Sequence, residues 1–130
     1  MTDNTRNRMG NCKNPYQGNA KKVLCVCSAG LLRSPTAARV LAEEYGFNTR
    51  ACGVYKEFAL IPLDPVLILW ADEVVVMDAY HQTAVEALII EHKITPPTIV
   101  NLDVEDNHEY MAPELVREIK NKYAAYLLKE

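Results

Sequence analysis

Four short apolar runs, each separated from the next by a stretch of helical character, constrain this chain more than any other feature. They lie at residues 22–27, 49–54, 73–77 and 98–102. The first, KVLCVC, is continuously apolar after its lysine, which is typical of a strand buried on both faces. Strands that alternate with helices favour βαβ units. We therefore predict a single α/β domain, a four-stranded parallel sheet flanked by helices on both faces.

Residues that start and stop helices fall between these runs. Pro35 opens a helix in whose first turn its missing N–H costs nothing, and Gly46 is a natural stop for it. Asp64 and Asp78 are each placed to cap the helix that follows them, and Pro113 opens the last helix. On the helix after Asp78, His81 is predicted to be a surface or packing residue.

The bulk composition bounds the size and partners of the domain. The chain has 130 residues, enough for one core. Residues 1–20 lack periodicity and are rich in Asn, Gly and Arg, so we predict a flexible arm followed by a domain over 21–130. A net charge of −3 gives no general attraction to nucleic acid or anionic membrane. No apolar run could cross a bilayer and the first residues show no secretory signal, so a cytoplasmic location is expected.

The four cysteines, at positions 12, 25, 27 and 52, form no C-x-x-C pair, and the three histidines are far from them in sequence. This spacing disfavours a zinc site, and we predict no metal or other cofactor. In a reducing compartment the thiols stay free. Cys25 and Cys52 are expected to be small core residues, with a redox role for Cys25 as an alternative, while Cys12 lies in the predicted arm.

The most informative segment is the loop CSAGLLRSP, from Cys27 to Pro35, between the first strand and the first helix. Ligands of open α/β sheets bind at the carboxyl ends of strands. A loop that enters a helix also directs its backbone N–H groups and the positive end of the helix dipole into one bowl, which suits a phosphate dianion. The predicted phosphate-binding residues are Ser28, Ala29, Gly30, Leu31, Leu32, Arg33 and Ser34.

The side chains of this loop match nucleophilic chemistry on a phosphate ester. Cys27, at the base of the bowl, is expected to be a thiolate at neutral pH and to act as nucleophile. Arg33 can grip two phosphate oxygens in bidentate fashion. Ser34 lies near enough in sequence to hydrogen-bond the thiolate. Gly30 allows the positive φ that a loop curling around an anion requires.

The spacing Cys-x5-Arg-Ser-Pro after an apolar strand resembles the low-molecular-weight protein-tyrosine phosphatases, and VLCVCSAGLLRSPTAA is closest to their bacterial and phage branch of predicted protein-tyrosine phosphatases. Further segments over residues 21–130 are similar to the second strand, the third strand and the last loop and helix of that family: RACG, LWADEVVVMD and LDVEDNHEYMAPEL. The resemblance implies a four-stranded parallel sheet, no cofactor, and hydrolysis of a phosphomonoester through a phosphocysteine intermediate. The partner implied is a phosphotyrosine protein or a small aryl phosphate.

The resemblance also implies an aspartate on the loop after the fourth strand that protonates the leaving oxygen. Asp103 and Asp106 are the candidates, and the family register, which usually reads Asp-Pro, favours Asp106. Asn107 replaces that proline, which predicts a less rigid acid loop. Gly30 replaces an Asn that often braces the phosphate loop in the family, which predicts a looser bowl.

Three further residues fall where the family places the walls of its substrate pocket. Tyr55 and Tyr110 correspond to aromatic walls around an aryl phosphate, and His108 lies in the acid loop. Tyrosines are equally common as partly buried packing residues, so this assignment is the weaker part of the predicted site.

Two other functions compete with phosphate-ester hydrolysis. Thiol-dependent arsenate reduction uses a related loop, but it needs resolving cysteines, and residues 72–130 contain none. Only Cys25 or Cys52 could stand in. A phosphate-reading or protein-binding module without turnover is the second alternative. Cys27, Arg33 and an acid are all retained, which favours the enzyme.

Overall fold

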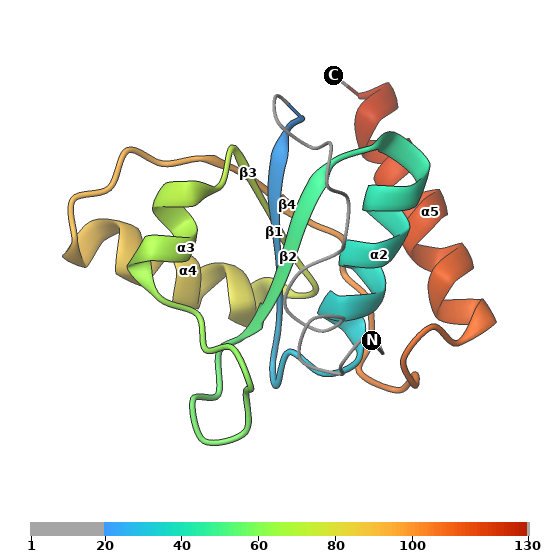
Figure 1. The fold of residues 1–130 in the computed structure, drawn as a ribbon, viewed down its shortest axis with the longest axis horizontal. Coiled ribbons are helices and arrows are strands. Elements are labelled where there is room, and N and C mark those ends of the chain that lie inside the picture. Colours follow the sequence, from blue (N-terminus) through green and yellow to red (C-terminus); the bar gives the residue numbers. More distant parts are fainter. Residues whose placement is uncertain (1–19, 130) are drawn as a thin grey trace, which may run out of the picture.

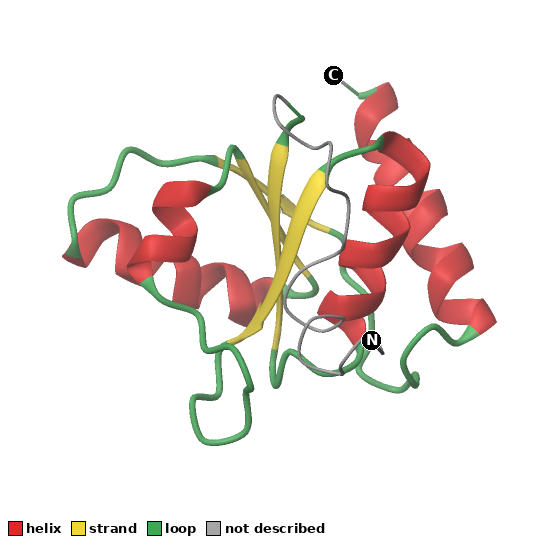
Figure 2. Ribbon diagram, in the orientation of Figure 1, coloured by secondary structure: helices red, strands yellow, loops and turns green. Residues whose placement is uncertain are grey.

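The computed structural model describes residues 20–129, so residues 1–19, which include most of the predicted arm and Cys12, lie outside the described residues. Strands and helices alternate as predicted, and the four strands form one parallel sheet in the order β2-β1-β3-β4 (Figures 1 and 2). The elements are β1 (Lys22–Cys27), α2 (Arg33–Tyr45), β2 (Asn48–Gly53), α3 (Pro65–Trp70), β3 (Glu73–Val76), α4 (Ala79–Glu91), β4 (Thr98–Asn101) and α5 (Pro113–Leu128).

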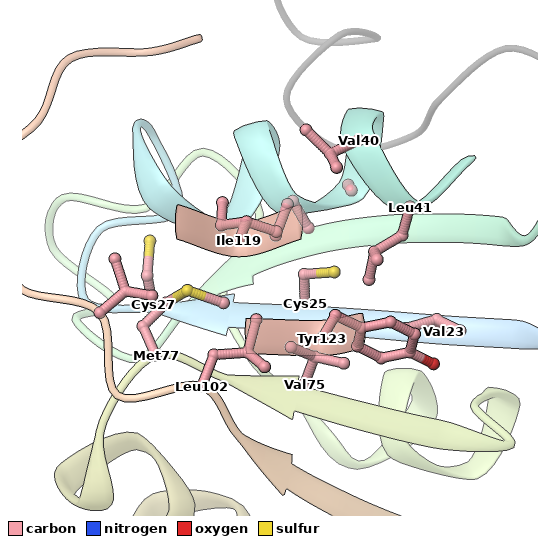
Figure 3. Packing of buried hydrophobic residues seen from close by; sticks show 14 of the residues in the cluster. Val23, Cys25, Cys27, Val40, Leu41, Val75, Met77, Leu102, Ile119 and Tyr123 are labelled. Atoms are coloured by element: carbon pink, nitrogen blue, oxygen red, sulfur yellow. The ribbon is translucent and has the colours of Figure 1, made fainter. Parts of the chain in front are cut away.

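Helices cover both faces of the sheet, which confirms the predicted fold class. In Figure 1, α2 and α5 lie on one side of the strands, and α3 and α4 lie on the other. The alternating side chains of β1 divide between two cores because successive residues of a strand point to opposite faces. Cys25 packs with Leu41 and Ile119 on the α2–α5 side (Figure 3), and Val26 packs with Ile68 and Val85 on the α3–α4 side.

The predicted helix boundaries are largely confirmed. The Asp64 carboxylate accepts a hydrogen bond from the backbone N–H of Leu67, and the Asp78 carboxylate accepts two from the first turn of α4. Gly46 ends α2 with a φ of 71°. The predicted start of α2 is late by one or two residues, because the Thr36 N–H donates to the carbonyl of Leu32 and this first turn, which contains Pro35, begins at Arg33.

A buried polar cluster joins α5 to the amino-terminal ends of the strands. Glu73 is 1% exposed, and its carboxylate accepts hydrogen bonds from the Tyr123 hydroxyl at 2.8 Å and from Lys21 Nζ at 2.6 Å. A buried carboxylate needs such partners because burial without them costs several kcal/mol. Burial, reinforced by the hydrogen bond to Glu73, raises the pKa of Tyr123, so its hydroxyl remains a donor. This cluster lies at the amino-terminal edge of the sheet, opposite the edge from which the loop after β1 emerges.

Over residues 20–129, none of the helices combines the length and the apolar character needed to cross a bilayer.

Candidate active site

Three loops meet at the carboxyl-terminal edge of the sheet. They follow β1, β3 and β4, which are neighbours in the sheet. The strand order reverses at β1, because β2 pairs with one edge of β1 and β3 with the other. Such topological switch points are where open α/β sheets bind ligands. Cys27, Asp78 and the segment from Leu102 to Asp106 are thereby brought together, although they are far apart in sequence.

The loop after β1 curls around the Cys27 sulfur as the sequence predicts. Cys27 is 3% exposed, and its Sγ accepts a hydrogen bond from the Gly30 N–H at 3.2 Å. The Ser34 Oγ lies 3.1 Å from the same sulfur, and the Ser34 hydroxyl also reaches the carbonyl of Cys52 at 3.2 Å. A backbone N–H and a hydroxyl group therefore both contact the Cys27 sulfur.

Two glycines allow this loop to pack directly on the end of β2. Gly30 has a φ of +73°, which confirms the predicted positive φ, and a Cβ there would lie 2.8 Å from the carbonyl carbon of Cys52. A Cβ on Gly53 would lie 2.4 Å from the carbonyl carbon of Ala29 and 2.6 Å from the nitrogen of Gly30. Neither approach leaves room for a methyl group, so the phosphate loop and β2 touch backbone to backbone.

Substitution of Gly53 by alanine is expected to distort the phosphate loop and weaken its anion binding by about tenfold or more, while the overpacking lowers the free energy of unfolding by about 1–3 kcal/mol. Urea unfolding and titration with inorganic phosphate measure the two effects. Gly46→Ala is the matched control, because a Cβ there meets nothing within 4 Å and only the positive φ is strained. Unchanged phosphate binding in Gly53→Ala would contradict the close packing.

Arg33 is buried at the start of α2, and its guanidinium contacts residues of the loops that follow β1, β3 and β4. Nη1 donates to the Val104 carbonyl at 2.8 Å, and Nη2 donates to the Ser28 Oγ at 3.3 Å. Two carboxylates flank it: Asp106 Oδ1 lies 3.5 Å from Nε and Asp78 Oδ2 lies 3.7 Å from Nη1. The rigid fork of donors is therefore held beside the Cys27 loop.

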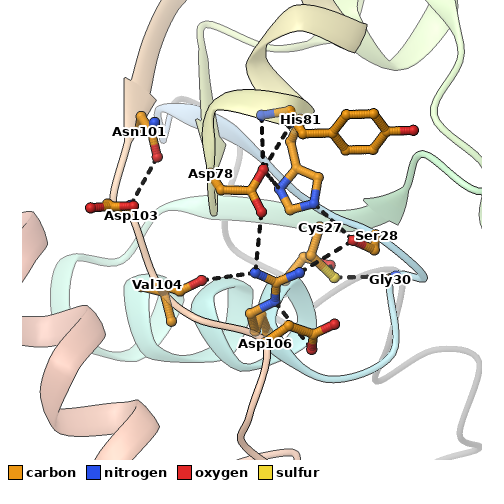
Figure 4. Close-up of polar contacts among 12 residues, drawn as sticks. Cys27, Ser28, Gly30, Asp78, His81, Asn101, Asp103, Val104 and Asp106 are labelled. Atoms are coloured by element: carbon orange, nitrogen blue, oxygen red, sulfur yellow. Dashed lines mark hydrogen bonds and ion pairs between the residues drawn. The ribbon is translucent and has the colours of Figure 1, made fainter.

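The structure places the two candidate acids, Asp103 and Asp106, in different surroundings. The largely exposed Asp106 carboxylate lies beside Arg33 at the mouth of the loop. Asp103 has a φ of +56°, and its backbone N–H donates to the Asn101 side chain at 2.8 Å. Figure 4 draws Asp103 well apart from Cys27. Asp103 thus braces the turn after β4, and of the two candidates Asp106 is the one whose carboxylate lies beside Arg33.

The predicted pocket walls divide into two groups. Tyr55 follows β2, and its backbone N–H donates to the Ser28 carbonyl at 2.9 Å. Its ring forms a cluster with the exposed rings of Tyr80, 5.8 Å away, and Phe58, 6.5 Å away. His108 and Tyr110 instead contact helices: the His108 Nε2 lies 3.5 Å from Glu118 of α5, and the Tyr110 hydroxyl hydrogen-bonds Arg39 of α2.

Sequence reasoning missed two partners of the loop. Asp78 caps α4 as predicted, and the same carboxylate also faces Arg33. His81 is fully buried, and its Nε2 lies 3.0 Å from the Ser28 Oγ. Its pKa is lowered to about 4, chiefly by burial and also by Arg33, against the opposing pull of Asp78 and Asp106. The position of Asp78 at the end of a strand was the available signal, with His81 one helical turn further.

Comparison with known proteins identifies the fold. No family model and no curated protein matches the sequence. Among solved structures, Wzb from Vibrio vulnificus in complex with benzylphosphonate is 19% identical with a TM-score of 0.65, covering 86% of this chain and 100% of that one. The tyrosine phosphatase Wzb from Escherichia coli K30 in complex with phosphate is 14% identical with a TM-score of 0.61, covering 85% and 98%.

A third solved structure is the YwlE arginine phosphatase from Geobacillus stearothermophilus, 20% identical with a TM-score of 0.56, covering 84% of this chain and 94% of that one. These proteins are low-molecular-weight protein-tyrosine phosphatases by fold. Near-complete coverage of each relative means that the whole domain is shared, not only the loop. The resemblance first indicated by Cys-x5-Arg-Ser-Pro is confirmed: this chain has the fold of the low-molecular-weight protein-tyrosine phosphatases.

Proposed function

We propose that this protein is a cysteine-dependent phosphatase that hydrolyses phosphomonoesters, with phosphotyrosine as the preferred substrate group. The observation that carries the proposal is the geometry of the loop: the buried Cys27 sulfur accepts from the Gly30 N–H at 3.2 Å, and the buried guanidinium of Arg33 donates to Ser28 of the same loop at 3.3 Å. The solved relatives bound to phosphate and to benzylphosphonate support a ligand of this chemistry in such a loop.

The proposed reaction has two steps and needs no metal. The Cys27 thiolate attacks phosphorus in line, the P–S bond forms, and the bond from phosphorus to the leaving oxygen breaks as Asp106 gives that oxygen its proton. The ionised Asp106 then accepts a proton from water, which attacks phosphorus and releases inorganic phosphate and the thiolate. Throughout, Arg33 and the loop N–H groups stabilise the negative charge on the equatorial oxygens.

The aromatic cluster of Tyr55, Phe58 and Tyr80 favours an aryl phosphate over an alkyl or guanidino phosphate. Tyr55 is tied by its backbone to the phosphate loop, so the cluster lies next to the bowl. Exposed aromatic rings provide stacking faces for a phenyl ring at little entropic cost. The arginine phosphatase among the solved relatives makes phosphoarginine the obvious competing substrate to assay.

The test of the proposal is hydrolysis of p-nitrophenyl phosphate and phenyl phosphate between about pH 5 and 7 with EDTA present, the range suited to a thiolate and a carboxylic acid. Wild-type protein is expected to turn over both and to form a phosphocysteine that can be trapped by rapid denaturation. Phosphotyrosine and phosphoarginine peptides then rank the substrates. A folded, reduced protein that binds phosphate without turnover would favour a phosphate-reading module.

The acid assignment is tested in the same assay with Asp106→Asn. Loss of the proton donor is expected to lower kcat by about 100-fold or more on phenyl phosphate and by less on p-nitrophenyl phosphate, whose leaving group needs a proton less. Asp103→Asn is the matched control on the same loop, with expected kcat unchanged. Equal losses in the two variants, or equal losses on the two substrates, would remove Asp106 from the acid role.

A further inference from the structure

Four side chains form a closed ring that joins α4 to the phosphate loop (Figure 4). The His81 Nε2 lies 3.0 Å from the Ser28 Oγ, and Ser28 accepts from Arg33 Nη2 at 3.3 Å. Arg33 Nη1 faces Asp78 at 3.7 Å, and the other oxygen of Asp78 lies 3.5 Å from the His81 Nδ1. The proposed phosphatase chemistry uses Arg33 and the loop, but it assigns nothing to His81.

The hydrogen-bonding capacity of each group determines which atoms donate and which accept among these four side chains. The guanidinium can only donate, so the Ser28 oxygen must accept from Arg33. The hydroxyl has one proton to give, and the nearest acceptor is the His81 Nε2. In a neutral imidazole, Nε2 can accept only when the imidazole proton is on Nδ1, and the facing Asp78 carboxylate favours a proton on Nδ1. The Ser28 hydroxyl then has both a donor and an acceptor partner, and the Nδ1 proton faces the Asp78 carboxylate at 3.5 Å without a charged imidazole beside Arg33.

We propose that His81 is a positioning residue of the phosphate loop: its neutral imidazole accepts the Ser28 hydroxyl proton and fixes the Ser28 oxygen as an acceptor for Arg33. Gly30 has no side chain that could contact Ser28, so the side-chain contacts to the Ser28 hydroxyl come from α4 and from the start of α2. The inference rests on the proposed function only in requiring that the loop binds phosphate.

The groups around His81 keep its imidazole neutral in mild acid, so the imidazole can still accept from the Ser28 hydroxyl. The charged and titratable groups that face it are Asp78 on α4, Arg33 on α2, Asp106 on the acid loop and the neighbouring ring of Tyr80. Burial dominates, and the pKa near 4 lies below the ordinary value of 6.5. The neutral ring therefore persists as pH falls from 7 to 5, and protonation sets in only as pH approaches 4.

The experiment compares the affinity for inorganic phosphate, by calorimetry, of wild type, His81→Phe, His81→Gln, Ser28→Ala and the double variant Ser28→Ala/His81→Phe. His81→Phe keeps a ring but no acceptor, and it is expected to weaken phosphate binding by about tenfold and to raise KM with kcat little changed. Gln places an amide where Nε2 lies and is expected to restore affinity to within about threefold. Ser28→Ala should cost the same tenfold, and the double variant no more than either.

Several outcomes would overturn the inference: wild-type affinity in His81→Phe, failure of Gln to restore it, or additive losses in the double variant. His92→Gln, an exposed histidine at the end of the same helix, is the matched control and should bind as wild type. Should His81→Phe fail to fold, nitrogen NMR of the wild-type ring tests the same point: a proton on Nδ1 supports the proposal and one on Nε2 overturns it. If wild type neither binds phosphate nor turns over, the proposed function itself has failed.

Discussion

Replacement of Cys27 by serine is expected to abolish phosphate-ester hydrolysis, with kcat at least about ten-thousandfold lower than that of wild type. The bowl holds the Cys27 sulfur under the Gly30 N–H and beside the Ser34 hydroxyl, and the proposed mechanism uses this sulfur as the nucleophile. A serine hydroxyl in the same place keeps its proton and cannot attack phosphorus at a comparable rate. The measurement is p-nitrophenyl phosphate turnover, together with calorimetric phosphate binding.

Phosphate binding separates loss of the nucleophile from loss of the site, and Cys27→Ser is expected to retain it. Cys25→Ala is the matched control, because Cys25 lies two residues earlier on β1 and is also buried. This variant is expected to lose stability through its cavity while it keeps its turnover. Residual turnover in Cys27→Ser above the background rate would require another nucleophile and would overturn the two-step mechanism.

Conversion of Arg33 to lysine is expected to lower kcat/KM by about a thousandfold, although the positive charge is kept. The guanidinium makes separate contacts through Nη1 to Val104 and through Nη2 to Ser28, and a single ammonium cannot span both. A lysine would also leave a point charge in place of the fork that matches two phosphate oxygens. Steady-state kinetics with p-nitrophenyl phosphate measures the loss.

Arg39→Lys is the control for this substitution on the same helix. Arg39 is exposed and contacts Glu43 and Tyr110, and a lysine ammonium can still donate to either partner, so the change is expected to leave kcat/KM within about twofold of wild type. If Arg33→Lys retained kcat/KM within tenfold of wild type, then a positive charge at position 33 would be enough for the reaction without a bidentate contact to phosphate. The bidentate clamp would then be removed from the proposed mechanism.

The sheet and the loop were predictable from sequence because both are encoded locally. A continuous apolar run such as KVLCVC indicates a buried strand by itself, and Asp64, Asp78 and Gly46 mark helix ends through contacts within one turn. The Cys-x5-Arg spacing likewise fixes both groups on one strand–loop–helix segment. Even so, the exact end of β2 follows from its pairing with β1, in which Cys27 lies opposite Gly53.

Contacts between distant segments were not predictable in the same way. His81 has the sequence surroundings of a surface or packing residue, and its contact to Ser28 spans 53 residues. His108 lies in the acid loop, yet it faces Glu118 on α5. In both cases the partner is set by how the helices pack on the sheet, and no periodicity within either segment records that packing.

By itself, the sequence determined the α/β class, the proposal of Cys27 as nucleophile and Arg33 as clamp, and the positive φ at Gly30, because each depends on residues within a few positions of one another. Only the tertiary structure decided which aspartate stands beside Arg33, which rings cluster near the bowl, and that a buried histidine from α4 contacts the loop. The parallel order β2-β1-β3-β4 brings the ends of β1, β3 and β4 to one edge, and that meeting of distant segments creates the site.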